Sequence, residues 1–443
     1  MPPEGFARRD LGLSLWDGVF FSLMVGLGET YLPAFALALG HGEVLAGLVA
    51  SVPMFVGGAV QLAAPRLAHA LGSNRRWVVA SAALQAAVFV PLVWAAWTGR
   101  LGALGLYLSA AAYWAAGLGA GPAWTSWFPP QVPYRLRSRY FAGRTRAAQA
   151  AVFLGLVGGG VALRAFDAHG RALEGFALCF LLAGLFRAVS TGLLAAQSEG
   201  TSRPLRPLGL RQALSRMGSS ELRRLFGYLV ALQAGVNFAA PYFTPYMLGQ
   251  LELGYGAYVA LVAAAYGARV VTLPLWGRLG HRIGGQRLLW IGAVGIAPTA
   301  IPWVLTDHFG VLFAAQVGAG VVWAAFELGS FLALFERLPD GERTSLLALY
   351  NLANSAAIAA GSIAGGLVLW NLGRSAETYT FLFAGTVVLR LTALAILPRT
   401  PAPARVPSAE PLGARTIAVR PTLGSIERPI LADEVDESSA QPR

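Results

Sequence analysis

Residues 274–290 read PLWGRLGHRIGGQRLLW, and residues 62–78 read LAAPRLAHALGSNRRWV. The two stretches have identical residues at five positions, at a constant offset of 212 residues along the chain. The matching pairs are Arg66 and Arg278, Leu67 and Leu279, His69 and His281, Gly72 and Gly284, and Arg75 and Arg287. Two such basic interruptions in a strongly apolar chain indicate an internal duplication.

The composition of the chain requires lipid as its solvent. Hydrophobic residues make up 56% of the 443 residues, charged residues only 13%, and the mean hydropathy is +0.56. A soluble domain with so few polar residues could not cover its surface. A bilayer core about 30 Å thick needs about 20 apolar residues per helix, and a chain in lipid satisfies its backbone only as helices or a closed barrel. Because the apolar runs are long and do not alternate, the sequence predicts an all-α integral membrane protein.

Twelve apolar spans can be placed along the sequence. They cover roughly residues 13–39, 44–68, 77–97, 101–128, 147–165, 174–196, 225–249, 253–278, 288–306, 309–335, 345–371 and 377–397. Three further echoes support two parallel six-helix halves: Tyr31-x-Pro33 with Phe243-x-Pro245, Gly119-Ala-Gly-x-x-Trp124 with Gly318-Ala-Gly-x-x-Trp323, and Gly155-x-x-x-Gly159-Gly160 with Gly361-x-x-x-Gly365-Gly366. We therefore predict halves at 1–196 and 225–397, a basic linker at 197–224 and a disordered, proline-rich tail at 398–443.

The 34 basic side chains are all arginine and are distributed unevenly among the predicted loops. The N-terminus, the even-numbered loops and the tail hold 27 of them, the odd-numbered loops hold four, and three lie inside spans. Positive charge gathers on the cytoplasmic side of membrane proteins. The asymmetry therefore predicts a multi-pass protein of the inner (cytoplasmic) membrane with both termini in the cytoplasm. It also accounts for the net charge of +12 without a nucleic-acid partner.

This architecture resembles the major facilitator superfamily of secondary transporters, in which two six-helix halves are joined by a cytoplasmic linker. Members carry a G-x-L-x-D-R-x-G-R-R-like loop between the second and third spans of each half. The likeness covers about residues 13–397. Within it, WTSWFPPQVPYRLRSRYFAGRTRAAQ at 124–149 is similar to a W-x-x-W…V-P-x-x-x-R-x-R-Y-F stretch of bacterial members.

The resemblance gives the repeated loop a gating role, in which it fastens neighbouring helices on the cytoplasmic side. The matching residues are Arg66, His69, Gly72 and Arg75 in the first copy, and Gly277, Arg278, His281, Arg282, Gly284 and Arg287 in the second. The glycines permit a tight turn, and the arginines meet helix dipoles and anionic lipid headgroups. Both copies have histidine where the family has aspartate. The fastening is then either weaker or sensitive to pH between about 6 and 7; ordinary loop charges are the simpler alternative.

Ionisable side chains inside a span cost several kcal/mol unless paired or hydrated, so they are functional candidates. Glu29 lies near the middle of the first span, and the family arrangement implies that it faces a central cavity as a proton or cation site. Arg269 and Glu327 lie about 16 and 12 Å from the cytoplasmic ends of spans eight and ten, and an ion pair would neutralise both. Structural roles are the alternatives for all three. We expect Arg187 and Arg390 to extend to the cytoplasmic interface.

Uncharged candidates for the cavity lie on the same set of spans. Gln233 and Asn237 are four residues apart and share a helix face. Trp124, Trp127 and Trp323 would supply flat apolar walls for an organic substrate, although tryptophan also favours the membrane interface.

These features predict a secondary carrier that moves a small organic solute by alternating access, with protons or another ion coupled through Glu29 or the Arg269 and Glu327 pair. The alternative is a transporter-like membrane protein that no longer transports and acts as a sensor or assembly partner. The sequence has no nucleophile–base pair, metal-binding pattern or phosphate loop. We therefore expect no enzyme activity, no cofactor and no metal, with membrane lipid as surroundings and a monomeric state.

Overall fold

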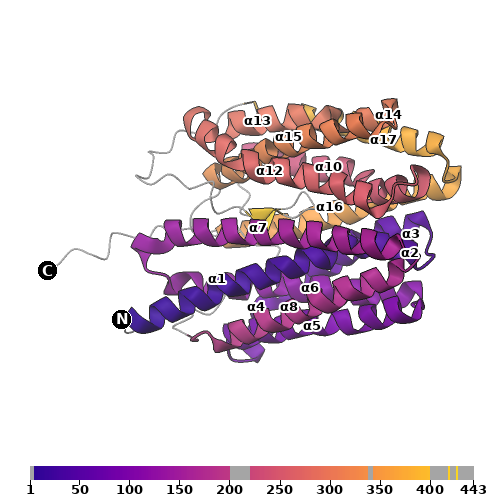
Figure 1. The fold of residues 1–443 in the computed structure, drawn as a ribbon. Coiled ribbons are helices and arrows are strands. Elements are labelled where there is room, and N and C mark those ends of the chain that lie inside the picture. Colours follow the sequence, from indigo (N-terminus) through magenta and orange to yellow (C-terminus); the bar gives the residue numbers. More distant parts are fainter. Residues whose placement is uncertain (1–3, 200–219, 338–342, 400–417, 420–425, 428–443) are drawn as a thin grey trace.

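The computed structural model describes residues 4–199, 220–337, 343–399, 418–419 and 426–427. Its helices run back and forth along a common direction, and the first membrane helix begins at the same end of the bundle at which the last one finishes (Figure 1). We call this end the terminal end and the other the opposite end.

The first half of the chain forms six membrane spans. Its elements are α1 (Glu4–Leu27), η1 (Glu29–Tyr31), α2 (Leu32–Ala38), α3 (Glu43–Leu48), α4 (Val52–Ala70), α5 (Asn74–Thr98), α6 (Ala103–Trp127), η2 (Pro129–Gln131), α7 (Tyr134–Asp167) and α8 (Ala172–Ala196). Span one comprises α1, η1 and α2, and span two comprises α3 and α4.

The second half repeats this arrangement with different interruptions. Its elements are α10 (Ser220–Asn237), η3 (Ala240–Tyr242), α11 (Phe243–Pro245), η4 (Tyr246–Gln250), α12 (Tyr255–Ile283), α13 (Gly285–Ile296), η5 (Ala297–Ala300), α14 (Pro302–Leu305), α15 (Phe309–Arg337), α16 (Arg343–Leu372), α17 (Ala376–Ala393) and η7 (Leu394–Ile396). Among the described residues, eleven helical stretches are long and apolar enough to cross a membrane. The segment 220–250, at the seventh predicted span, brings the number to twelve. The predicted all-α membrane fold is confirmed.

The first span of each half is broken at a corresponding place. Pro33 cannot donate a hydrogen bond to the carbonyl of Glu29, and Pro241 cannot donate to that of Asn237, so the regular helices end before these prolines. A short 3₁₀ turn follows in both halves, and the helix then resumes. These breaks expose backbone groups in the middle of the bundle, where side chains from other spans can meet them.

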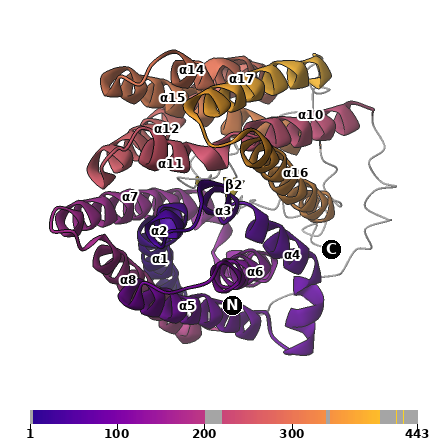
Figure 2. The ribbon, with the colours of Figure 1, turned by 90° about the vertical axis from the view of Figure 1, so that its right-hand side faces the viewer.

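The two halves pack against each other along two helix pairs, α4 with α16 and α7 with α12 (Figure 2). At the opposite end, α2 and α3 of the first half also contact η3 and α11 of the second. The outer surface carries large exposed apolar side chains such as Val90, Trp97, Leu104, Val271 and Leu305, each at least 70% exposed. A continuous apolar exterior of this kind fits a lipid environment.

The largest difference from the predicted bounds is at the start of span five. Span five is predicted to start at residue 147, whereas α7 begins at Tyr134 and includes the arginine-rich segment that reads as a loop. The buried partner of Arg144, described below, explains why a charged segment can belong to the helix.

The linker and tail lie mainly outside the described residues. Residues 200–219 of the predicted linker and most of the predicted disordered tail are among them. Of the tail, 398–399 continue from η7, while β1 (Ala418–Val419) and β2 (Ile426–Glu427) form an antiparallel pair, and β1 contacts α7.

Candidate functional site

Glu29 is the first residue of the 3₁₀ turn that interrupts span one. Its side chain is 4% exposed, and its Oε2 accepts a hydrogen bond of 2.8 Å from the hydroxyl of Tyr113 on α6. The same hydroxyl lies 3.3 Å from the sulfur of Met24. Spans one and four therefore meet through a buried carboxylate and a phenol, an arrangement that can hold a proton or contact a cation.

Arg269 and Glu327 form a buried ion pair within the second half. The guanidinium Nη1 of Arg269 on α12 lies 3.2 Å from Oε1 of Glu327 on α15, and the two side chains are 8% and 1% exposed. The guanidinium also lies over the ring of Trp323, 5.9 Å from its centroid. Two opposite charges at this separation attract strongly where water is excluded, so a proton or a charged solute that reaches one partner would release the other.

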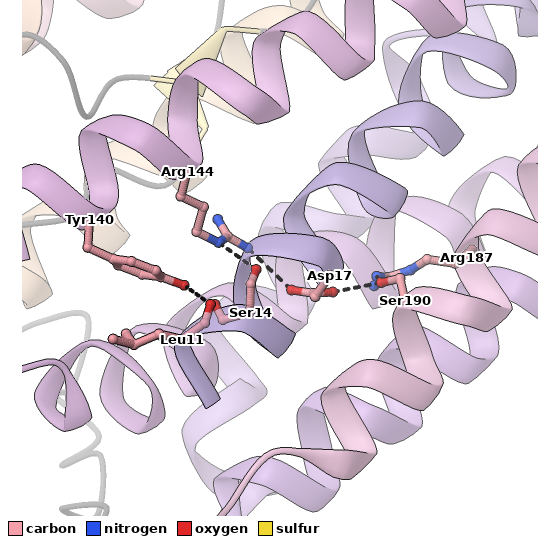
Figure 3. Close-up of polar contacts among 7 residues, drawn as sticks. All are labelled: Leu11, Ser14, Asp17, Tyr140, Arg144, Arg187 and Ser190. Atoms are coloured by element: carbon pink, nitrogen blue, oxygen red, sulfur yellow. Dashed lines mark hydrogen bonds and ion pairs between the residues drawn. The ribbon is translucent and has the colours of Figure 1, made fainter. Parts of the chain in front are cut away.

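The first half contains a second buried ion pair that the sequence analysis missed (Figure 3). Asp17 on α1 accepts a contact of 3.2 Å from Arg144 on α7 and a hydrogen bond of 2.7 Å from the hydroxyl of Ser190 on α8. Arg144 also donates to the carbonyl of Ser14 and lies 4.8 Å from the ring centroid of Trp124. Asp17 lies inside the predicted first span, so the cost of a charge within a span could have identified it from the sequence.

In each half, an arginine guanidinium thus lies over the ring of the repeated tryptophan, which is Trp124 in the first half and Trp323 in the second. The arginine comes from α7 in the first half and from α12 in the second, and each arginine has a carboxylate 3.2 Å away. Trp124 and Trp127 are buried in a cluster at the terminal end, and Trp127 donates to the carbonyl of Ser198. They therefore lie inside the first half, away from Glu29.

Arg187 and Arg390 do not extend to the membrane interface, so this expectation is wrong. Arg187 is 2% exposed and donates to Ser190 at 2.7 Å, beside the ring of Phe21. Arg390 is 3% exposed and donates to the carbonyl of Ile296 and the hydroxyl of Thr299. Each guanidinium thus has polar partners inside its own half and does not have to reach water to find them.

Gln233 and Asn237 lie on one face of α10, directly before the break in span seven. Both are buried, and the amide nitrogen of Asn237 donates to the backbone carbonyl of Gln233 at 2.9 Å. Nearby, the hydroxyl of Tyr266 on α12 donates to the side chain of Gln149 on α7. The Tyr266 and Gln149 pair is a buried polar contact between the two halves.

Two tyrosines hold the broken helices in the same way in both halves. The hydroxyl of Tyr31 donates to the carbonyl of Leu156, and that of Tyr242 donates to the carbonyl of Ser362. Each ring lies against a glycine of the repeated pattern on α7 or α16, at positions where a Cβ atom would collide with it. These contacts pair Tyr31 with Tyr242, one residue away from the Phe243 that the sequence alignment paired with it.

The repeated loops lie at the terminal end. Gly72 and Gly284 have φ angles of +68° and +85°, where glycine is favoured. The side chains of Arg66, His69, Arg278, His281, Arg282 and Arg287 are exposed, and Gly277 is partly buried. Arg75 donates to the carbonyl of Ala195 at the end of α8, so the first copy fastens span three to span six.

The second copy meets a carboxylate that the sequence analysis did not single out. Oε1 of Glu336, in the last turn of α15, accepts a hydrogen bond of 3.1 Å from the backbone N–H of Gly285 at the start of α13. Burial raises the pKa of this carboxyl, while the Gly285 N–H and the charge of Arg337 lower it. A cavity of about 340 Å³ beside it is lined by Arg282, Gln286 and Arg287, among others. Thus an acidic side chain from span ten stands near the position of the missing aspartate.

Within the part of the chain that the structure describes, no three histidine, cysteine or acidic side chains gather closely enough to hold a metal ion. The polar groups described above are therefore the candidate site: Glu29 with Tyr113, Arg269 with Glu327, and Asp17 with Arg144.

Comparison with known proteins gives consistent similarities. The sequence model of the Major Facilitator Superfamily matches residues 225–432. An uncharacterised MFS-type transporter of Mycobacterium tuberculosis is 28% identical over 159 residues, which are 35% of this chain and 28% of that relative. The aligned region thus spans little more than a quarter of the relative's length.

Solved structures share the fold across nearly the whole chain. The nucleoside transporter NupG matches with a TM-score of 0.64 and 14% identity, covering 88% of this chain and 100% of its own. A bacterial homologue of the iron transporter ferroportin, in an outward-facing state, matches with a TM-score of 0.57 and 15% identity, covering 88% and 98%. At these identities the likeness is one of fold.

Proposed function

We propose that this chain, whose residues 225–432 match the Major Facilitator Superfamily model, is a proton-coupled secondary transporter of that superfamily that moves a small organic solute across the cell membrane by alternating access. The family and the likeness to solved transporters support a transporter rather than an enzyme. The chain is a multi-pass membrane protein. The arginine distribution supports a cytoplasmic position for the terminal end, and a single copy contains both halves that the mechanism needs.

Our proposal of proton coupling rests on the buried ion pair between Arg269 and Glu327. A one-to-one pair is electrically neutral, so it can remain inside the membrane while the protein is empty. Protonation of Glu327 leaves Arg269 as a net positive charge, which favours either an anionic solute or a change of conformation. The pair can therefore convert the arrival of a proton into a different affinity for the solute, which is the requirement for coupling.

Glu29 supplies a second polar group at the break of span one. Its hydrogen bond from Tyr113 joins spans one and four, which in this family line the central cavity together with spans seven and ten. Gln233 and Asn237 occupy the corresponding part of span seven. These groups provide hydrogen-bond acceptors and donors for a polar organic solute, and Trp323 adds an aromatic surface beside the ion pair.

The test is proton movement driven by solutes in proteoliposomes that contain a pH-sensitive dye. An imposed pH gradient is challenged with a panel of organic solutes, beginning with nucleosides because a solved structure of this fold is a nucleoside transporter. We expect one solute class to move protons in the wild type, and Glu327→Gln and Glu29→Gln to retain solute exchange while losing proton-driven accumulation. Glu174→Gln is the matched control, because this carboxylate pairs with Arg171 at the surface. Normal accumulation in the Glu327 and Glu29 variants would refute proton coupling at these sites.

A further inference from the structure

The Gly42–Glu43 turn at the opposite end joins the two halves. Glu43 is the first residue of α3 in the first half, and both of its carboxylate oxygens accept hydrogen bonds from the second half. Oε1 accepts from the amide nitrogen of Gln250 at 3.0 Å, and Oε2 accepts from the hydroxyl of Tyr379 at 2.9 Å. One carboxylate therefore connects span two with the end of span seven and the start of span twelve.

The surrounding backbone leaves no space between the halves at this place. A Cβ atom on Gly249 would lie 2.8 Å from Oε1 of Glu43, and one on Gly47 would lie 2.5 Å from the ring of Tyr242. A Cβ on Gly42 would lie 3.1 Å from the guanidinium of Arg374, which belongs to the second half. The halves are in close contact around Glu43, so any separation at the opposite end must first break its two hydrogen bonds.

Glu43 is also placed where protons from the surrounding water can reach it. It is only partly buried and lies at the end of the bundle, unlike Glu29 and Glu327. Hydrogen bonds to a charged carboxylate are stronger than those to a neutral group, and Glu43 accepts two of them. A protonated carboxyl group has lost its charge and become a donor, so it makes weaker hydrogen bonds to Gln250 and Tyr379.

Other titratable groups near this turn are few and can be tested separately. Arg374 and Tyr379 face Glu43 from the loop before α17 and from α17 itself. Behind Tyr379, the ring of Tyr246 packs at 5.1 Å, and its hydroxyl donates to Asp307. His41 lies two residues before Glu43, but its Nε2 contacts the carbonyl of Leu101 within the first half.

We propose that Glu43 is a proton-binding site that fastens the two halves at the opposite end, and that its protonation releases them to separate there. The proposal rests on the alternating-access motion of the proposed function, but it needs neither the identity of the solute nor proton coupling at Glu327. Two proton-binding sites are then proposed: Glu327 inside the membrane, and Glu43 at the contact between the two halves.

The experiment measures the separation of the halves directly. In a Cys179→Ser background, spin labels at Arg100→Cys and Glu377→Cys report on exposed positions at the opposite end, one on each half. We expect electron–electron distances in lipid nanodiscs to be short at about pH 8 and to shift toward a longer population at about pH 4. The ratio of long to short populations should rise at least about tenfold, as expected for weakening two charge-assisted hydrogen bonds.

Substitutions at the turn separate the role of Glu43 from that of its neighbours. Glu43→Gln should show the longer population at both pH values and lose the pH response, and Tyr379→Phe should shift in the same direction with the response retained. Gly249→Ala should separate the halves by crowding the carboxylate. The controls His41→Gln and Asp307→Asn should titrate like the parent.

Short distances in Glu43→Gln, or a parent distribution that does not change with pH, would overturn the proposal. If instead the distance between the halves changes with pH as expected while no solute in the transport panel moves protons, the proposal of proton-coupled transport fails. The proposal for Glu43 then stands. The two failures are therefore distinguishable.

Discussion

Neutralising Glu327 while leaving Arg269 in place should destabilise the protein far more than neutralising both. In Glu327→Gln, the guanidinium remains 8% exposed beside a neutral amide, at a position where water cannot replace the lost charge. In the double variant Arg269→Gln/Glu327→Gln, two amides of similar size can hydrogen-bond to each other. The two variants therefore differ mainly in whether Arg269 keeps its buried charge after losing the carboxylate of Glu327.

The geometry sets the size of this effect. Two unit charges 3.2 Å apart attract by about 5 kcal/mol at an effective dielectric constant of about 20. Breaking a buried pair by removing one partner costs about 3–5 kcal/mol, whereas replacing both partners together is often close to neutral. The position of Arg269 over Trp323 recovers part of the cost in the single variant, by about 1 kcal/mol. We expect a coupling free energy of at least about 2 kcal/mol between the two substitutions.

The measurement is a double-mutant cycle on the purified protein, with free energies of unfolding from titration of detergent micelles with sodium dodecyl sulfate. The surface pair of Arg171 and Glu174 serves as the control, because its side chains are 58% and 39% exposed and its charges stay in water in every variant. That control pair should show no measurable coupling. Additive effects for Arg269 and Glu327, within about 0.5 kcal/mol, would show that the buried pair does not compensate its charges and would refute the reasoning.

Four other substitutions test separate parts of the structure by the same unfolding measurement. Tyr242→Phe and Tyr31→Phe should each cost about 0.5–1.5 kcal/mol, because each removes one buried hydrogen bond between helices; no loss would exclude these hydroxyls as fasteners of the broken helices. Burial raises the pKa of Glu336, so between the ordinary carboxyl value and the raised value the folded protein binds more protons than the unfolded chain. Wild-type stability should therefore fall as pH rises through that interval, and Glu336→Gln should reduce the fall; identical pH profiles would contradict this. Gly320→Ala places a Cβ 2.1 Å from the carbonyl of Ala265 and should destabilise the packing of α15 on α12 by about 1–3 kcal/mol, with unchanged stability as the contradicting result.

The fold could be predicted from the sequence because its determinants are local or periodic. Apolar runs of membrane-spanning length and a repeated loop at one offset indicate a duplicated helical bundle, and glycine-rich faces mark where helices meet. The largest departure is the start of α7 at Tyr134. Its arginines indicate a cytoplasmic loop when the local sequence is considered alone, because that sequence shows their charges but not their contacts with residues far away in the chain. Arg144 belongs to the helix because Asp17, 127 residues away in the sequence, lies beside it.

Only part of the candidate site could be predicted, namely the residues that stand out as charges inside apolar spans. Arg269 and Glu327 were singled out because both are charges inside long apolar spans. Asp17 satisfies the same rule, so its omission was avoidable. Glu43 and Glu336 lie at the ends of helices, where a charge is ordinary, and nothing in the sequence shows that their partners come from spans seven and twelve or from α13. Partners that are distant in sequence decide whether such a charge is a surface group or a structural connection.

The duplication has kept the mechanical parts of the two halves alike and has let their charges diverge. The offset that brings Tyr31 onto Tyr242 brings Glu29 onto Ala240, so both broken helices are held by a tyrosine, but only the first has an acidic residue at the break. The repeated tryptophans both hold an arginine, yet those arginines come from different spans. A motion that exchanges the roles of two halves needs matching hinges, whereas binding one asymmetric solute needs different groups on its two sides. Selection on both requirements would leave this combination.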